Sequence, residues 1–459
     1  MVRRRRRRTR NLPSDPVELT IDRISHEGRG VASNDGKVAF VEGGLPGERV
    51  MARYLHCRSS FDETTAIEVL DPSPDRVTPP CPYFTVCGGC SLQHLASLSQ
   101  IEFKQELLLD QLHHATGLDT DSIELLNIER GPTLHYRRKA RLAVRYVEKK
   151  GGALVGFREK HSTFVTQMDS CHVLTTGISR LLTPLKELVN KLDARRDVPQ
   201  FEVAAGNNDA GKSTVALILR HLQPLSAEDL DTLSEFAADF DCELYLQPKG
   251  PDSIHKLWPA EGEDRLHYLV IDPSFPNLPL TMKFHPADFV QINEEINSKA
   301  IRLAIDLLDL EPADRVLDLF CGLGNFSLPL ARHCRQLTGI EGSEEMVTRA
   351  GENATTNNIG NASFEMANLY ELSGSETWLG KKYSKVLLDP PRSGALELID
   401  WLVQCGARKI VYISCNPATL ARDASLLVNG GYALRRAGVM DMFPHTAHVE
   451  SIAEFELVK

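Results

Sequence analysis

The residue best suited to nucleophilic chemistry in this sequence is a cysteine, Cys415. It follows the apolar run Val411–Ile413, and its direct neighbours are Ser414 and Asn416. A structural cysteine usually has apolar neighbours, whereas this one stands in a polar turn after a predicted strand. In open α/β sheets, ligands bind outside the carboxyl ends of the strands. Cys415 is therefore a candidate nucleophile, provided that its thiol can ionise.

A general base is available in the segment 441–451, shortly before the last predicted strand. Glu450 is the first candidate, and His445 and His448 are the alternatives. The thiol raises a separate question, because lowering its pKa from about 8.5 to about 7 requires roughly 2 kcal/mol of local stabilisation. The sequence does not show which group supplies it.

A glycine-containing turn after another predicted strand is suited to holding a nucleoside. Gly322 and Gly324 permit a tight turn against a ligand before the next helix begins. Glu341 ends the following strand, where a carboxylate can accept both hydroxyls of a ribose. Asn325 stands where a dinucleotide site has a third glycine. The pattern therefore favours a cofactor without a pyrophosphate, such as S-adenosylmethionine, over NAD.

Two more polar residues follow predicted strands of the same region. Asp389 lies in Leu387-Leu-Asp-Pro-Pro-Arg392, and Asn368 follows the run 362–366. The paired prolines stiffen their loop. Both residues are candidates for the ligand-binding edge of the sheet, and the alternative is that each merely stabilises its loop.

Ten cysteines without an export signal predict a chain that works in a reducing compartment, here the cytoplasm. Cys81, Cys87 and Cys90 form a cluster in the sequence, and Cys171 follows much later. Four thiolates at this spacing suit structural zinc or an iron–sulfur cluster, and chance is a third reading. No run of eighteen apolar residues is present, so no membrane span is predicted.

The segment Gly206–Ser213 satisfies the P-loop pattern G-x-x-x-x-G-K-[ST]. A P-loop needs a helix directly after its lysine. The residues after Ser213 are instead rich in β-branched types, and the run before Gly206 is also strand-like. The pattern therefore predicts a hairpin turn and not a phosphate site.

The spacing of strands and turns predicts three folded regions after a basic arm at 1–11. Residues 12–72 hold five short runs punctuated by glycines, typical of a small β-barrel of the OB type. Residues 73–280 are predicted as a central α+β domain with the cysteine cluster and a hairpin at 134–157. From 281 to 459 strands alternate with helices, which predicts a doubly wound, Rossmann-like α/β domain. The five barrel runs are 17–25, 30–32, 37–42, 48–57 and 65–70.

The net charge of −10 argues against binding nucleic acid over the whole surface, but it permits local basic segments. The arginine tract at 3–10 suits an arm that neutralises phosphates, a nuclear-localisation patch or a solvated tail. The hairpin holds a second basic segment, an RNA-binding candidate whose alternative is a solvated sheet face. Its cations are Arg137, Arg138, Lys139, Arg141 and Arg145.

These motifs together resemble the RNA uracil-C5 methyltransferase family, over nearly the whole chain. The barrel region resembles the TRAM domain of RNA-modifying enzymes. The motifs of the likeness are, in chain order, Phe289-Val-Gln291-Ile-Asn, Asp318-Leu-Phe-Cys-Gly-Leu-Gly-Asn-Phe, Leu388-Asp-Pro-Pro-Arg, Ser414-Cys-Asn-Pro and His448-Val-Glu.

The resemblance implies a mechanism and a set of site residues. Cys415 would add to C6 of a uracil so that C5 can accept a methyl group, and Glu450 would then remove the C5 proton. Cys81, Cys87, Cys90 and Cys171 would hold a [4Fe–4S] cluster. The residues implied to contact S-adenosylmethionine are Gln291, Phe320, Asn325, Glu341, Asn368 and Asp389.

Family members that act on tRNA lack both the barrel and the cluster. Their combination here implies a uracil of 23S rRNA as substrate, in a single strand or loop and flipped out to reach Cys415. The resemblance implies position 1939 of 23S rRNA, and another rRNA uracil is an alternative because some relatives with both features modify two sites. A non-catalytic RNA-binding or ribosome-assembly factor and a cytosine-C5 methyltransferase remain as alternative functions.

Overall fold

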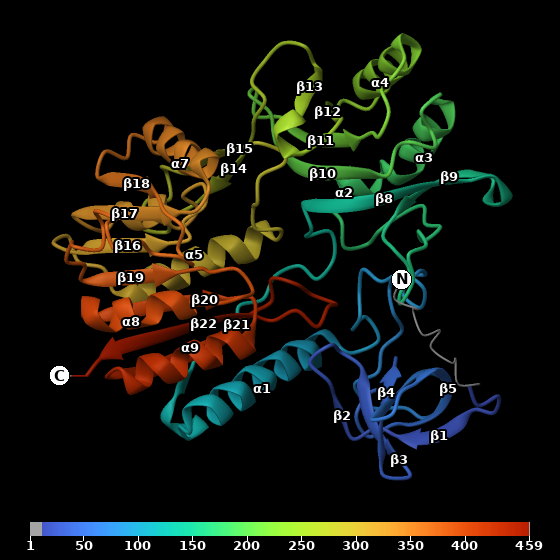
Figure 1. Cartoon of the computed structure of the whole chain (residues 1–459), viewed down its shortest axis with the longest axis horizontal. Coiled ribbons are helices and arrows are strands. Elements are labelled where there is room, and N and C mark those ends of the chain that lie inside the picture. The colour runs from blue at the N-terminus through green and yellow to red at the C-terminus, as the bar shows by residue number, and fades with distance from the viewer. Residues whose placement is uncertain (1–11, 459) are drawn as a thin grey trace, which may run out of the picture. The chain divides into compact units, whose positions relative to one another are not determined.

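The structure, a computed structural model, describes residues 12–458 except for the side chain of Thr120 (Figure 1). The arginine tract lies outside the described residues, so the prediction of a basic arm is not tested. Contacts divide the chain into two units. The first comprises the chain up to Thr85 together with Gly89–Lys104 and His445–His448, and the second comprises Val86–Gly88, Gln105–Pro444 and the chain from Val449.

The first unit contains a six-stranded sheet in the order β1-β5-β6-β4-β3-β2. The run predicted as one strand at 17–25 is two strands, because the chain changes partner at Ile21 and Asp22. Ile21 N–H donates to the Glu48 carbonyl and Asp22 N–H to the Val31 carbonyl. The strands are β1 (Val17–Thr20), β2 (Arg23–Ile24), β3 (Gly30–Asn34), β4 (Lys37–Glu42), β5 (Arg49–Cys57) and β6 (Phe61–Asp71).

A buried carboxylate, Glu48, ties this sheet to the segment that leaves it. Glu48 accepts hydrogen bonds from the backbone of Leu45 and Ser73 and from the guanidinium of Arg76. Burial would raise the pKa of Glu48, but these hydrogen bonds and the charge of Arg76 outweigh it and hold the pKa below its ordinary value. The carboxylate therefore stabilises the fold in its charged form.

The second unit contains a central sheet in the order β13-β12-β11-β10-β14-β15, with β8 pairing to both β10 and β9. β10 and β11 form an antiparallel hairpin that closes at Asn207 and Ser213. The P-loop-like segment is thus a turn, as predicted. The strands are β8 (Lys139–Val147), β9 (Gly152–Gly156), β10 (Gln200–Asn207), β11 (Ser213–Arg220), β12 (Glu243–Gln247), β13 (His255–Trp258), β14 (Leu266–Val270) and β15 (Leu280–Phe284).

The basic segment at 137–145 was predicted as an RNA-binding strand, and this is wrong for two of its cations. Arg138 is buried, and its guanidinium lies 4.1 Å from the ring centroid of Tyr268. The Lys139 ammonium donates to the Pro286 carbonyl at 2.7 Å and pairs with Glu202. Both cations are therefore committed to contacts with segments that are distant along the chain. Arg141 and Arg145 are exposed.

The second unit also contains an eight-stranded sheet in the order β18-β17-β16-β19-β20-β22-β21-β7. The strands from β18 to β20 are parallel, and β22 is antiparallel to β20. This is the doubly wound α/β arrangement that the sequence predicts. The strands are β16 (Arg315–Leu319), β17 (Gln336–Glu341), β18 (Ala362–Met366), β19 (Lys385–Leu388), β20 (Lys409–Ser414), β21 (Tyr432–Met440), β22 (Glu450–Leu457) and β7 (Glu124–Leu125).

Helices lie on both faces of this sheet (Figure 1). α5 packs on β19 and β20, while α8 and α9 pack against each other and α9 contacts β20 to β22. The α-helices of the described chain as a whole are α1 (Ser97–Thr116), α2 (Thr176–Ser179), α3 (Leu182–Lys191), α4 (Ala227–Asp239), α5 (Glu294–Leu308), α6 (Ser327–Ala331), α7 (Glu344–Thr356), α8 (Leu396–Cys405) and α9 (Pro417–Asn429). Among the described residues, no helix is long and apolar enough to cross a membrane.

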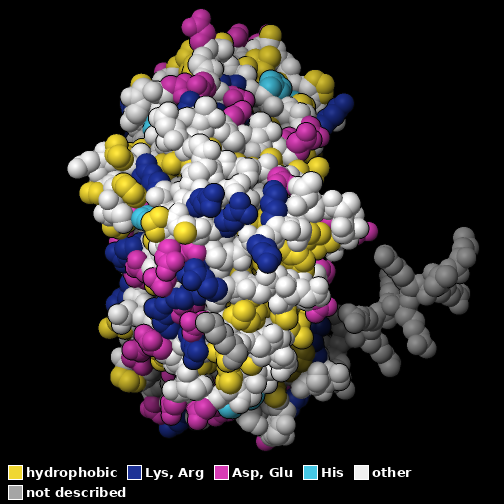
Figure 2. All heavy atoms as spheres, turned by 90° about the vertical axis from the view of Figure 1, so that its left-hand side faces the viewer, with side chains coloured by type: hydrophobic (Ala, Val, Ile, Leu, Met, Phe, Trp, Pro, Cys, Tyr) yellow, Lys and Arg dark blue, Asp and Glu magenta, His cyan; other side chains and the backbone are white. Residues whose placement is uncertain are grey.

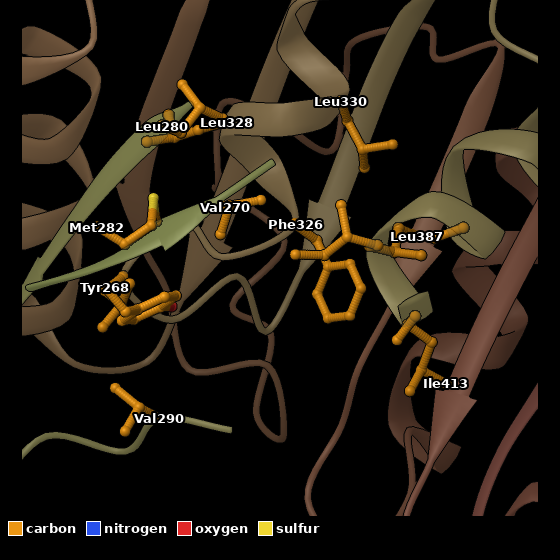
Figure 3. Close-up of a cluster of buried hydrophobic side chains, with 14 of the residues drawn as sticks. Tyr268, Val270, Leu280, Met282, Val290, Phe326, Leu328, Leu330, Leu387 and Ile413 are labelled. Atoms are coloured by element: carbon orange, nitrogen blue, oxygen red, sulfur yellow. The ribbon is translucent and has the colours of Figure 1, made fainter. Parts of the chain in front are cut away.

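One hydrophobic cluster joins the two sheets of the second unit (Figure 3). Val270 and Met282 of the central sheet share it with Phe326, Leu387 and Ile413 of the α/β region. Burying apolar surface in common favours a fixed arrangement of the two sheets. The core thus supports β19 and β20, whose carboxyl ends carry part of the candidate site.

The surface shown in Figure 2 carries Lys and Arg interspersed with Asp and Glu. Near the amino ends of the parallel strands, basic and acidic side chains form ion pairs. Arg408 pairs with Asp314 at 2.8 Å, and Lys409 pairs with Glu454 at 3.0 Å. The carboxylates of both pairs, Asp314 and Glu454, are buried, so each cation compensates a carboxylate that burial would otherwise destabilise.

We expect Glu48→Gln to destabilise the first unit by about 3 kcal/mol, because it leaves Arg76 without its buried partner. Hydrogen–deuterium exchange of the full chain should show faster exchange in β4 to β6. Since the pKa of Glu48 is lowered in the fold, its contribution is present above the unfolded value of 4.5 and is lost as the pH falls through the folded value. Equal exchange in variant and wild type at pH 7 would contradict this role.

Candidate active site

The predicted site residues of the second unit follow neighbouring strands at one edge of the α/β sheet. In the parallel ladders, Leu319 is level with Ile340 and Leu388, and Leu388 is level with Tyr412. The residues just beyond these positions therefore lie along one edge, as the sequence predicts. They are Phe320 after β16, Glu341 at the end of β17, Asn368 after β18, Asp389 after β19 and Cys415 after β20.

The turn after β16 has the backbone that its glycines predict. Gly322 and Gly324 both have positive φ angles, of 55° and 92°. Phe320 also has a positive φ of 66°, although a side chain disfavours this conformation. Glu341 holds the turn in place by accepting the N–H of Gly322 at 3.1 Å. This hydrogen bond thus fixes the Glu341 carboxylate relative to the glycine turn.

The side chain of Asn325 forms hydrogen bonds within the protein. Its carboxamide exchanges hydrogen bonds with that of Asn297, at 2.8 and 2.9 Å. The Tyr268 hydroxyl donates to the same Asn325 oxygen at 2.9 Å. The side chain is thereby oriented, and its contact with a ligand stays a prediction.

Gln291 and Asn368 lie on less regular chain. The Gln291 carbonyl accepts the Nε–H of Arg138 at 2.7 Å, which fixes this segment to the residue that precedes β8. Asn368 is exposed, and its side-chain oxygen accepts the N–H of Tyr370 at 3.1 Å. The Tyr370 ring lies 5.8 Å from that of Phe320, so two segments proposed to meet the same ligand are in contact.

Cys415 and Glu450 are brought together by the sheet itself. Ser414 of β20 pairs with Ser451 of the antiparallel strand β22. The next residue along β20 and the preceding residue of β22 are Cys415 and Glu450, so they stand opposite each other. Cys415 is half-buried, whereas Glu450 is buried.

The two histidines proposed as rival bases belong to the first unit. His445 is buried there, and Gln100 binds both its backbone N–H, at 2.8 Å, and its ring, at 3.2 Å. His448 is exposed. Glu450 is the candidate base that belongs to the same unit as Cys415.

Acidic groups dominate the charge around this edge. Burial raises the pKa of Asp389 to about 7. Burial, followed by the charge of Asp389, holds the pKa of Glu450 well above its usual range. Burial also raises the pKa of Asp318 to about 7, with Asp389 and Glu341 adding to the rise and a hydrogen bond from Ser327 opposing it.

The pKa of the Cys415 thiol is also raised. Burial, followed by the Glu450 and Asp389 carboxyls, raises its pKa to about 11, and the positive charge of Arg392 acts against that rise. The protein alone therefore does not lower the thiol pKa toward 7.

The predicted iron–sulfur site is not confirmed. Cys81, Cys87 and Cys171 are buried, and none of these or Cys90 forms a disulfide. Within residues 12–458, no three His, Cys, Asp or Glu side chains are grouped so as to hold a metal ion.

Several supporting residues escaped the sequence analysis. Tyr268 and Asn297 orient Asn325, and Asp318 is fully buried with one oxygen that has no hydrogen-bond partner. Asn297 had a detectable signal, because it is a polar residue on the apolar face of α5 beside Ile296 and Ala300. Tyr268 gave no signal, because a tyrosine in a strand is common.

Comparison with known proteins identifies the class of fold and then the family. Residues 15–57 match the TRAM domain, and residues 99–455 match the tRNA (uracil-5-)-methyltransferase family. The second match covers most of the chain, including the glycine turn, Cys415 and Glu450. The chain belongs to this uracil-5-methyltransferase family.

Similar proteins are found along the full length. A protein of Alcanivorax borkumensis, named 23S rRNA (uracil(1939)-C(5))-methyltransferase RlmD, is 48% identical over 453 residues that cover 99% of both chains. A Hahella chejuensis protein of the same name is 48% identical over 457 residues, covering 98% of this chain and 99% of that one.

Among solved structures, the tRNA (uracil-54, C5)-methyltransferase of Pyrococcus abyssi in complex with S-adenosyl-L-homocysteine has a TM-score of 0.70. It covers 96% of this chain and 100% of its own, at 24% identity. At that identity, the likeness supports the fold alone.

We expect Cys415 to react slowly with iodoacetamide in the absence of RNA and methyl donor. A pKa of about 11 leaves so little thiolate that alkylation at pH 8 should be on the order of a hundredfold slower than that of free cysteine. Peptide mass mapping resolves Cys415 from the other thiols. Since the Glu450 carboxyl raises this pKa, Glu450→Gln should move the alkylation profile to lower pH. An apparent pKa below that of free cysteine would contradict this description of the site.

Proposed function

We propose that this enzyme methylates C5 of a uracil in 23S rRNA, at the position equivalent to uracil 1939. The observation that carries the proposal is the pairing of Ser414 with Ser451, whose register brings Cys415 opposite Glu450 at the same sheet edge as the glycine turn. The full-length similarity to proteins named for the 1939 site supports the choice of RNA and position.

Cys415 is proposed as the nucleophile. C5 of uracil is a weak nucleophile, and addition of a thiolate to C6 makes C5 enolate-like, so that it can accept a methyl group. S-adenosylmethionine, when bound, supplies that methyl from a positively charged sulfur, whose charge also favours the thiolate over the thiol. The positive charge of Arg392 acts on Cys415 in the same sense.

Glu450 is proposed as the base that completes the reaction. After methyl transfer, C5 carries both the methyl and its original proton. Glu450 takes that proton, the C5–C6 double bond re-forms, and the bond between C6 and the Cys415 sulfur breaks. Because burial and Asp389 raise the pKa of Glu450, its carboxylate is a stronger base than an exposed one.

The residues along the glycine turn fit a nucleoside methyl donor. Glu341 is held by three backbone N–H groups, from Gly322, Gly342 and Ser343, and so presents an oriented carboxylate. Such a carboxylate can accept ribose hydroxyls. We propose that Phe320, Asn325, Asn368, Asp389 and Gln291 complete the binding site for the donor.

A uracil inside paired RNA cannot reach a thiol at a sheet edge. We therefore propose that the enzyme takes the base from a loop or single strand and flips it out, which costs least where the base is unpaired. The TRAM domain supports an RNA partner. Arg145 is the exposed cation of the predicted basic segment that we propose for phosphate contacts, whereas Arg141, also exposed, pairs with Glu202 at 3.1 Å.

Cys81, Cys87, Cys90 and Cys171 are proposed to hold a [4Fe–4S] cluster. The proposal is supported by their spacing in the sequence, by burial of three of them and by the absence of disulfides among them. No step of the methylation requires electron transfer, so we propose a structural role for the cluster.

Mapping of rRNA modifications tests the overall function. In a strain that lacks this gene, mass mapping should show one unmethylated uridine, at the position equivalent to 1939. The wild-type gene should restore the methyl group, and Cys415→Ser should not, because no other group can add to C6. A fully methylated uridine in the deleted strain, or methylcytidine as the missing product, would contradict the proposal.

Metal analysis tests the cluster independently of activity. Protein purified without oxygen should contain about four iron and four sulfide per chain. Cys87→Ser should lose most of the iron, whereas Cys242→Ser, at a buried cysteine outside the set, should retain it. Zinc in place of iron, or equal iron in both variants, would refute the assignment.

A further inference from the structure

The loop between β19 and α8 is tied to the helix that follows Cys415. Three side chains at the start and along the body of α9 reach this loop. The Asn416 amide donates to the Arg392 carbonyl at 3.0 Å, and Arg422 donates to the Ser393 carbonyl at 3.0 Å. Asp423 accepts the N–H of Ala395 at 2.8 Å.

Asp423 is the centre of these contacts. It is fully buried, and besides Ala395 it accepts the hydroxyl of Tyr412 at 2.7 Å and the Nε–H of Arg422 at 2.7 Å. A buried carboxylate is costly unless several donors compensate it. Tyr412 belongs to β20, three residues before Cys415, so Asp423 joins the strand of the candidate nucleophile to the loop.

The backbone of the loop lies directly against this carboxylate. Gly394 has a φ of 78°, and a Cβ there would lie 2.7 Å from an Asp423 oxygen and 2.6 Å from an Arg422 nitrogen. No side chain fits in that space. The backbone of the loop at Gly394 thus packs directly against side chains of α9.

The held loop carries two groups that act on the thiol. Asp389 and Arg392 from the loop and Glu450 from β22 are the charged residues whose fields reach Cys415. The position of the loop therefore sets the balance between an acid that disfavours the thiolate and a cation that favours it.

We propose that Asp423 is a positioning residue, which holds the segment 392–395 of the loop so that Arg392 keeps its place beside Cys415. The inference rests on the proposed role of Cys415 as the nucleophile. It assigns Asp423 a function beyond packing, because a carboxylate with only a packing role would leave the reactivity of Cys415 unchanged.

The test is the pH dependence of Cys415 alkylation in the full chain, without RNA, for Asp423→Asn and Arg422→Gln. Without the contacts of α9, Arg392 should move away from Cys415 and the thiolate should lose its favourable positive charge. The pH profile of Cys415 alkylation should then shift upward by roughly one pH unit, since a nearby opposite charge moves a pKa by about 1 to 3 units. Arg422 is partly exposed, so Arg422→Gln decides the question if Asp423→Asn fails to fold.

Asp314→Asn is the matched control. Asp314 is also buried, and it accepts a backbone N–H from Glu311 and a guanidinium from Arg408, but it precedes β16 at the opposite edge of the sheet. Its profile should equal that of wild type. Coincident profiles in all folded variants, or an equal shift in the control, would overturn the proposal. Because the assay needs no turnover, its outcome is separate from that of the rRNA mapping.

Discussion

The structure of the site depends on one hydrogen-bonded pairing, that of Ser414 with Ser451 in neighbouring antiparallel strands. β22 enters the sheet against the direction of β20, so its second residue, Ser451, pairs with the last residue of β20, Ser414. A shift of one residue in this register would turn Glu450 to the other face of the sheet. The Ser451 hydroxyl, which donates to the Ser414 carbonyl at 3.0 Å, adds a side-chain contact that holds the pairing.

A second constraint is the accumulation of buried acids along the same edge. Burial raises the pKa values of Asp318, Asp389 and Glu450, and the charge of Asp389 adds to the rise at Asp318 and Glu450. Burial and two of these neighbours' charges also keep the Cys415 thiol protonated. A cation bound among these groups would reverse both effects. The charge pattern thus suits a positively charged ligand, such as the proposed methyl donor.

The sequence was most informative where local pattern and strand topology agree. The glycine turn, Asp389 and Cys415 were predicted at one sheet edge because parallel strands place their carboxyl ends together. The hairpin at Gly206–Ser213 was predicted because no helix follows its lysine. The TRAM-like region was predicted from its short strands, although the change of partner at Ile21 was not.

Predictions from the sequence fail or are missing where contacts between distant segments of the chain determine the environment of a side chain. Arg138 and Lys139 look like a basic surface in the sequence, but Tyr268 and Glu202, distant along the chain, turn them inward. The role of Asp423 depends on a loop almost thirty residues earlier, at Ala395. The pKa of Cys415 depends on burial and on the fields of three other side chains, none of which its neighbours in the sequence reveal.

The most direct test of the central claim uses RNA with 5-fluorouridine at the target position, incubated with S-adenosylmethionine. Fluorine cannot leave C5 as a proton, so the reaction should stop with the base bound to the protein. Peptide mapping should place the adduct on Cys415 in wild type and in Cys405→Ser, and no adduct should form in Cys415→Ser. An adduct on another residue, or none with folded protein that binds the RNA, would contradict the placement of this thiol at the reacting carbon.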